Sequence, residues 1–348
     1  MRTPAAETNR FLHRFAWFTA GATVLLICSG GMVTSKGVGL AVPDWPTTFG
    51  YNMFFFPISK WVGGIFFEHT HRLIASLIGF LTIILAFWLA FSKVERWIKV
   101  LGWASLGAVI LQGILGGLRV TLLKDEIGIF HACLAQAFLG LLVVIALATS
   151  PSWRKLAASR ATAPARFLAI FALVISGLIY AQLGLGATMR HQHRDLPILD
   201  FPLAYGQVWP ATDLATIAQI NRARDAQALS DVSAGQIWLQ MAHRFVAAAI
   251  GLTIAAFWFL VRRKRDLNPI LARLANLWLG LVIMQIALGA WTIWSNKAAD
   301  IATAHVAVGA LTFATGIVIC AVLLRLRQST DAPPATRPEP QLAEAAAT

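Results

Sequence analysis

The segment Phe66–Phe80, which reads FFEHTHRLIASLIGF, places Glu68, His69, His71 and Arg72 at the start of an apolar run. Ionisable side chains are costly inside a membrane because they lose their water there, so each is a functional candidate. A spacing of three places Glu68 on the same helical face as His71. His69 points elsewhere, and we expect it to face the rim of the bundle.

Three further histidines, His131, His243 and His305, lie near the start of other apolar runs. Two imidazoles that face each other from separate helices can bind one metal. In an apolar helix bundle without nearby thiolates, the natural candidate is heme with two axial histidines. The histidine pairs His71/His131 and His243/His305 therefore predict two heme sites. The alternative for any one histidine is a hydrogen bond to a neighbouring carbonyl.

An arginine follows the first histidine of each pair, Arg72 after His71 and Arg244 after His243. A guanidinium group suits the carboxylates of heme propionates, although an arginine near a membrane surface also reaches water by extending its side chain. The two halves differ three residues before these histidines, where one has Glu68 and the other has Gln240. This asymmetry predicts proton chemistry at the first site only. The alternative is that Glu68 pairs with Arg72, four residues later.

Apolar runs of membrane-spanning length must position these residues. The chain has 348 residues, of which 57% are hydrophobic and 13% charged, about half the charged fraction of a soluble domain. We predict an all-α integral membrane protein. The eight expected spans are 14–34, 68–91, 98–118, 128–149, 166–188, 237–261, 270–293 and 301–324.

The chain repeats itself. His243 follows His71 by 172 residues and His305 follows His131 by 174, while PDWP at 43–46 resembles LDFP at 199–202 more weakly. Equivalent points are separated by four spans, which predicts two tandem, pseudo-symmetric four-helix bundles. We divide the chain into a tail (1–13), a first four-helix unit (14–150), a linker (151–165), a second four-helix unit (166–326) and a disordered tail (327–348).

Lysine and arginine orient the spans. The two termini and the loops on their side hold 18 of the 29 basic residues. By the positive-inside rule, both termini are cytoplasmic and the histidines lie toward the outer face of a plasma membrane. The net charge of +13 therefore reports topology rather than nucleic-acid binding.

Other candidate ligands carry weaker signals. The three cysteines, Cys28, Cys133 and Cys320, form no CxxC motif and predict neither a disulfide framework nor a zinc site. His191 and His193 lie in the RHQHRD segment near the end of the fifth span. A surface metal site is one interpretation of this pair, and a solvated loop is the other.

The motifs EHTHR (68–72) and MAHR (241–244), with His131, His305 and the PDWP loop, resemble the heme A synthase family over nearly the whole chain. The resemblance implies oxidation of the C8 methyl of heme O to a formyl group by successive hydroxylations. It implies that His243 and His305 ligate a resident heme b. It further implies that His71 and His131 bind the heme O substrate, with Glu68 as the essential carboxylate. Some members have a cysteine pair in the first outer loop, which this chain lacks between Lys36 and Phe67.

The resemblance also implies partners. We expect heme O synthase and an electron donor to interact with the chain within the membrane lipid, and a homo-oligomer is a further candidate. Two other functions use the same four histidines. One is a diheme b-type cytochrome that only transfers electrons, and the other is a heme carrier. The difference between Glu68 and Gln240 favours the enzyme, because electron transfer alone does not need a carboxylate at one of the two sites.

Overall fold

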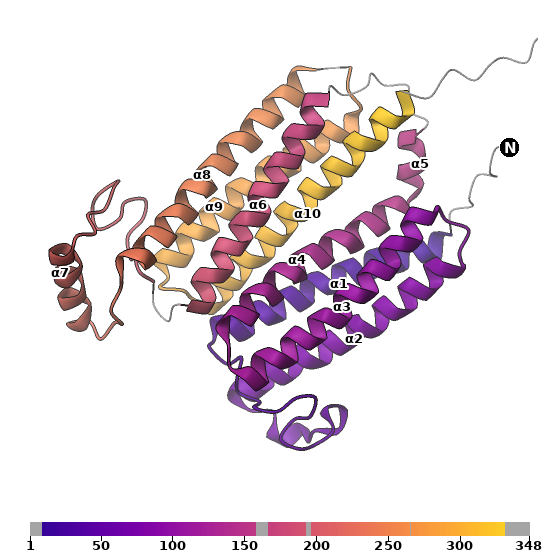
Figure 1. Cartoon of the computed structure of the whole chain (residues 1–348). Coiled ribbons are helices and arrows are strands. Elements are labelled where there is room, and N and C mark those ends of the chain that lie inside the picture. The colour runs from indigo at the N-terminus through magenta and orange to yellow at the C-terminus, as the bar shows by residue number, and fades with distance from the viewer. Residues whose placement is uncertain (1–8, 158–165, 193–195, 265, 331–348) are drawn as a thin grey trace, which may run out of the picture.

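Eight long helices form the body of the chain (Figure 1). The computed structural model describes residues 9–157, 166–192, 196–264 and 266–330, and these residues form no β-strand. Each long helix has the length and hydropathy to cross a bilayer, which confirms the all-α membrane fold and the eight expected spans. They are α1 (Arg10–Ser35), α2 (Gly63–Phe91), α3 (Arg96–Leu122), α4 (Asp125–Ala148), α6 (Arg166–Gln192), α8 (Ala234–Arg263), α9 (Pro269–Trp294) and α10 (Ala299–Thr330).

Capping side chains set several helix boundaries. The side chain of Asn9 accepts hydrogen bonds from the N–H groups of Phe11 and Leu12, so α1 begins at Arg10, earlier than expected. Ser233 and Gln236 form a capping box at the start of α8. Asn268 caps α9, where Pro269 occupies the first turn.

Shorter elements connect the spans. Residues 151–157, expected as part of a linker, form α5 (Pro151–Ala157), and α7 (Leu214–Asp225) lies between α6 and α8. Two 3₁₀ turns, Met53–Phe55 and Ile58–Lys60, lie between α1 and α2. Helix α10 continues to Thr330, beyond the expected end of the second unit. The rest of the linker (158–165), the start of the first tail and the tail from 331 lie outside the described residues.

The spans pack in two rings of four. In the first ring each of α1, α2, α3 and α4 contacts the next, and α4 closes the ring on α1. In the second ring α6 contacts α8, α8 contacts α9, α9 contacts α10, and α10 returns to α6. Helices α2 and α4 therefore stand at opposite corners of one ring, and α8 and α10 at opposite corners of the other.

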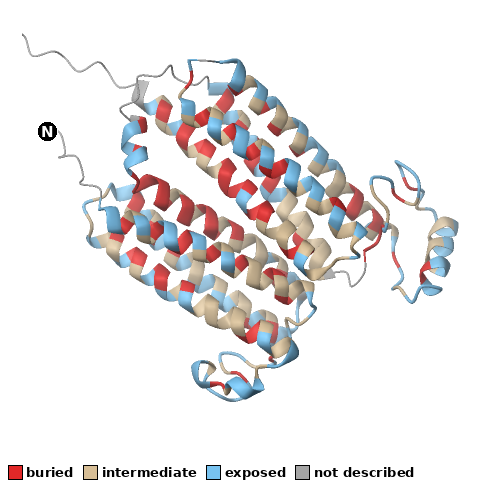
Figure 2. Cartoon of the chain, turned by 180° about the vertical axis from the view of Figure 1, so that it is seen from behind, coloured by how far each residue is buried: buried red, intermediate tan, exposed pale blue. Residues whose placement is uncertain are grey.

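The two rings meet along α1 and α4 on one side and α6 and α10 on the other. Burial follows this seam, with red residues concentrated on the inner helices (Figure 2). In the most apolar 18-residue stretch of α10, 67% is buried inside the protein, compared with 17% in the corresponding stretch of α3. The exposed residues of α3 are largely apolar, including Val100, Trp103 and Ile110, as a lipid-facing surface requires. The chain is thus a multi-pass membrane protein.

Two caps cover one end of the bundle. We call residues 36–62 the first cap and residues 196–233, which include α7, the second cap. Both lie at the end opposite the start of α1 and the end of α10 (Figure 1). Helices α2, α4, α8 and α10 begin at the cap end, so the first turns of all four lie close to the caps.

Candidate heme-binding site

The four predicted histidines lie at one depth, within the first three turns of their helices at the cap end. His71 and His131 stand on opposite corners of the first ring, and His243 and His305 on opposite corners of the second. Each of these histidines is half-buried, and the Nδ1 atom of its imidazole is buried without a hydrogen-bond partner. Four orphaned imidazole nitrogens at one depth are consistent with ligands of groups held between the helices.

A glycine on the preceding span makes room for each imidazole. A Cβ atom would come tightly against the imidazole at Gly30, Gly186 and Gly289, and within ordinary contact distance of it at Gly116. We call these four positions the cradle glycines. The Cβ to Cε1 distances would be 2.9 Å for Gly30 with His71, 3.5 Å for Gly116 with His131, 3.3 Å for Gly186 with His243 and 3.1 Å for Gly289 with His305.

The donor set fits a macrocycle better than a bare ion. Among the described residues there is no cluster of three or more histidine, cysteine, aspartate or glutamate side chains that would hold a metal. Two imidazoles at opposite corners of an apolar ring instead suit a flat group that supplies its own equatorial nitrogens, as heme does.

Glu68 joins α2 to the first cap. Its carboxylate is buried, with 4% of the residue exposed. Oε1 accepts a hydrogen bond of 2.7 Å from Nη2 of Arg72, and Oε2 accepts one of 2.9 Å from the N–H of Val42. The ion pair that we considered as an alternative is therefore present, and the same carboxylate also holds the cap.

Arg72 reinforces this attachment. Its guanidinium group donates hydrogen bonds to three cap carbonyl oxygens, those of Val42, Asp44 and Thr47. Arg244 does the same in the second half, donating to the carbonyl oxygens of Asp200, Pro202 and Leu203. Both arginines thus attach a cap to a histidine-bearing helix, and a contact with propionates stays a prediction.

Gln240 takes the place of Glu68 in the second half. Its Oε1 accepts a hydrogen bond of 2.8 Å from the N–H of Ile198, and its Nε2 donates one of 3.1 Å to the carbonyl oxygen of the same residue. With 2% of the residue exposed, Gln240 is as buried as Glu68. The two caps are therefore held in equivalent ways, one by an ion pair and the other by a neutral amide.

The caps share a turn that the PDWP and LDFP motifs only partly indicate. Asp44 accepts hydrogen bonds from the N–H groups of Phe49 and Gly50, and Asp200 from those of Tyr205 and Gly206. Asp200 follows Asp44 by 156 residues, whereas the histidines repeat at 172 and 174. The second cap accommodates the extra residues, which include α7.

Electrostatics favour the ionised form of Asp44. Partial burial opposes ionisation, but hydrogen bonds from Gly50, Thr47 and Phe49 outweigh it and hold the pKa of Asp44 below its ordinary value. The turn is therefore most stable with a charged carboxylate.

The other histidines have separate settings. His69 is fully buried in the first cap, where its Nδ1 lies 3.2 Å from the hydroxyl of Thr48 and its ring lies against Phe56 and Trp61. The side chain of His69 therefore packs against the first cap, and its orientation relative to a heme stays a prediction. His191 lies against Gly128 at the start of α4, and His193 lies outside the described residues.

Arg190 is a cap-end residue that sequence reasoning missed. It lies near the end of α6 and donates to the carbonyl oxygen of Gly31 and the hydroxyl of Ser35 on α1. This contact crosses the seam between the rings next to the cradle glycine Gly30. The sequence signal for Arg190 is a basic residue at the cap end of the bundle, where basic residues are few.

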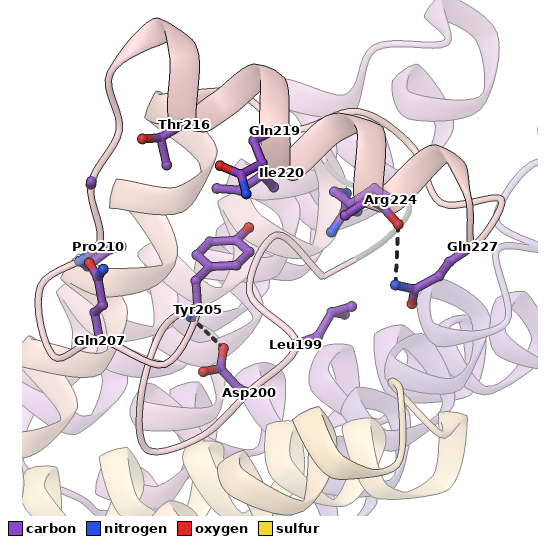
Figure 3. Close-up of a pocket in the computed structure, with 12 residues that line it drawn as sticks. Leu199, Asp200, Tyr205, Gln207, Pro210, Thr216, Gln219, Ile220, Arg224 and Gln227 are labelled. Carbon is purple, nitrogen blue, oxygen red and sulfur yellow. Dashed lines mark hydrogen bonds between the residues drawn. The ribbon is translucent and has the colours of Figure 1, made fainter.

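A pocket of about 650 Å³ lies within the second cap (Figure 3). Tyr205 and Arg224 line it together with residues of α7, and the guanidinium of Arg224 donates to the carbonyl oxygens of Leu196, Pro197 and Ser230. None of the four predicted ligand histidines lines this pocket, so it is a separate feature of the cap.

Comparison with known proteins identifies the family. Residues 51–317 match the COX15-CtaA family, described as a cytochrome oxidase assembly protein. The chain is 26% identical to proteins named heme A synthase from Shouchella clausii, over 83% of this chain and 89% of the relative, and from Halalkalibacterium halodurans, over 91% and 98%. A third relative of that name, from Alkalihalophilus pseudofirmus, is 26% identical over 58% of this chain and 67% of its own length.

The family match covers most of the chain, including all four histidines, and confirms the resemblance drawn from the EHTHR and MAHR motifs. The chain therefore belongs to the COX15-CtaA family of cytochrome oxidase assembly proteins.

Proposed function

We propose that the chain is a heme A synthase, an oxidoreductase that converts the C8 methyl of heme O to a formyl group by successive hydroxylations. The methyl becomes an alcohol and then a gem-diol, which loses water. Each hydroxylation inserts one oxygen atom and removes two electrons from the carbon, so an external oxidant and a source of oxygen atoms are co-reactants. The observation that carries the proposal is the asymmetry between two otherwise matching histidine pairs, of which only the first has a carboxylate, Glu68, one turn away. The family membership and the relatives named heme A synthase support it.

In this proposal His243 and His305 hold a resident heme b, and His71 and His131 hold the substrate. A bound heme b supplies one-electron redox chemistry to the site. The chain contributes the rest. The cradle glycines admit the imidazoles, the two caps cover the cap end of the bundle, and the apolar helices exclude water.

Glu68 lies one helical turn before the proposed substrate ligand His71 and accepts a hydrogen bond from the first cap. We propose that it carries a proton or stabilises positive charge near the reacting methyl. The ion pair with Arg72 and the hydrogen bond from Val42 fix its position, which is what such a role requires. Pure electron transfer would need no carboxylate at this position. In the second half, the equivalent position holds the neutral amide of Gln240.

The proposed orientation places the caps outside the cell and both termini in the cytoplasm, following the distribution of basic residues. Heme O synthase and an electron donor are the proposed partners.

Heme analysis tests the function directly. Hemes extracted from cells that make heme O, with and without this chain, are separated by chromatography. We expect heme A only with the intact chain, and heme O alone with the His71→Ala variant. Unchanged heme O in cells that contain a folded, heme-loaded chain would instead favour the electron-transfer cytochrome.

A further inference from the structure

A glutamine precedes three of the four cradle glycines by four residues. Residues four apart lie on one helical face, one turn from each other. The pattern occurs as Gln112–Gly116 on α3, Gln182–Gly186 on α6 and Gln285–Gly289 on α9, whereas α1 has Leu26 before Gly30.

Each glutamine contacts the histidine that lies in the adjacent cradle. Nε2 of Gln112 donates a hydrogen bond of 3.0 Å to the carbonyl oxygen of His131, and Nε2 of Gln182 donates one of 2.8 Å to that of His243. Nε2 of Gln285 lies 3.4 Å from the ring Nε2 of His305. The amides thus connect each of these histidines to the neighbouring helix.

The three amides share a second property. The Oε1 atoms of Gln112, Gln182 and Gln285 are all buried without a hydrogen-bond partner, a property that Gln136 of α4 also has. What sets Gln112, Gln182 and Gln285 apart from Gln136 is the contact between Nε2 and a predicted ligand histidine.

His71 lacks this support. It has the cradle glycine Gly30, but the residue one turn earlier on α1 is the half-buried, apolar Leu26. Leucine has no side-chain donor or acceptor, so it cannot anchor α2 beside His71. The sequence and the contacts therefore single out one histidine of the four.

We infer that Gln112, Gln182 and Gln285 are positioning residues that hold His131, His243 and His305 as ligands, and that His71 is the exchangeable ligand. The inference rests on the proposed function, in which these histidines bind heme. Both ligands of the second pair are held, as a resident group requires. The first pair has one held and one free histidine, as a site that takes up substrate and releases product requires.

Heme exchange measures this difference. The full chain is purified in detergent with heme b and heme O bound, and excess apomyoglobin is added to capture released heme. Chromatography separates the two hemes, so each loss rate is followed separately. A net hydrogen bond corresponds to a change of about tenfold in an equilibrium. We expect Gln182→Leu and Gln285→Leu to speed heme b loss about tenfold, and Leu26→Gln to slow heme O loss by a similar factor.

Spectroscopy separates positioning from general loosening. Each variant that changes a loss rate should also shift the low-spin electron paramagnetic resonance signal of the affected heme, because the axial imidazole changes orientation or basicity. Gln136→Leu is the matched control, since Gln136 of α4 also precedes a glycine by four residues and has a buried, unpaired Oε1, but its glycine, Gly140, lies against Phe313 and Ile317 rather than a histidine, so the variant should change neither rate nor signal.

Unchanged loss rates and signals in all three variants, with both hemes bound in the unmodified chain, would overturn the inference and leave the proposed function standing. Failure of the unmodified chain to bind low-spin heme would overturn the proposed function itself. Leu26→Gln adds a contact rather than removing one, so it decides the question if the leucine variants do not fold.

Discussion

Glu68 and Gln240 occupy equivalent places in the two bundles, where each accepts a hydrogen bond from the main-chain N–H of a cap residue. The bond to Glu68 comes from Val42 at 2.9 Å, and the bond to Gln240 comes from Ile198 at 2.8 Å. The chain thus contains its own neutral counterpart of the proposed catalytic carboxylate. The shape and the hydrogen bond are the same, and the charge differs.

Replacing Glu68 with glutamine tests the charge alone. The amide oxygen can still accept the hydrogen bond from Val42, and Arg72 keeps three carbonyl partners, so the fold and the resident heme should persist. We expect heme A formation to fall by about 100-fold or more, the range for loss of a proton-transfer group, or to stop at the alcohol. Chromatography of cellular hemes measures it. The reverse change, Gln240→Glu, should be tolerated or slightly destabilising, and a normal heme A yield from Glu68→Gln would remove Glu68 from the mechanism.

Loss of either second-half histidine should remove the resident heme. His243→Ala or His305→Ala leaves one imidazole where two are needed for a six-coordinate low-spin heme. We expect the purified variant to lose its heme b, measured as the ratio of heme absorbance to protein. His69→Ala is the control, because His69 contacts the first cap and not a heme ligand position, and it should keep that heme. Full retention of one low-spin heme in both histidine variants would contradict the assignment.

Arg72 and Arg244 should each hold one cap. Lysine keeps the charge but cannot reach several carbonyl oxygens at once with a fork of donors. Arg72→Lys should therefore make the first cap sensitive to protease added from the outside of the cell, with the second cap unchanged, and Arg244→Lys should do the reverse. Mass spectrometry of the fragments identifies the cleaved cap. Cleavage only from the cytoplasmic side would show that the proposed orientation is inverted.

The pKa of Asp44 predicts an acid-sensitive first cap. Because its folded pKa lies below its ordinary value, ionised Asp44 stabilises the turn above that value, and this stabilisation is lost as the pH falls through the folded pKa. Pepsin cleavage of the first cap should therefore increase, relative to that of the Asp44→Asn variant, as the pH falls below 3.8, the ordinary pKa of an aspartate. Asp44→Asn should be cleaved readily across the range, because one amide oxygen replaces two carboxylate acceptors. Equal pH dependence in both forms would exclude this role for Asp44.

Sequence patterns predict the spans and the four histidines because both follow from hydropathy and from the cost of ionisable groups in a membrane. The caps are harder to predict. Arg72 suggests a propionate ligand in sequence, yet in the structure it binds carbonyl oxygens of residues about thirty positions earlier. Backbone acceptors leave no trace in residue type, so such contacts require coordinates.

The cradle glycines are also only partly predictable from the sequence. Gly116 and Gly289 are recognisable as part of the repeat, but Gly30 and Gly186 repeat at 156 residues, the spacing of the caps, and not at the spacing of the histidines. The insertion that contains α7 shifts the second histidine pair relative to the first spans. A single repeat length therefore misses half of the glycines, although the contacts with the imidazoles are equivalent.

Alanine at the cradle glycines tests whether the imidazole positions matter for binding. In Gly30→Ala the new methyl would lie 2.9 Å from Cε1 of His71, and in Gly186→Ala it would lie 3.3 Å from Cε1 of His243. The first contact is too short for the ring to stay in place, so Gly30→Ala should weaken heme O binding at the first site and leave the resident heme unchanged. Gly186→Ala should weaken binding of the resident heme by a smaller amount, because its contact is less severe.

Gly113→Ala is the matched control, since a Cβ there meets no atom within 4 Å, and alanine should if anything favour the helix. Separate chromatography of heme O and heme b bound to each purified variant measures both sites. Equal heme content in Gly30→Ala and Gly113→Ala would show that His71 does not bind the substrate from this cradle.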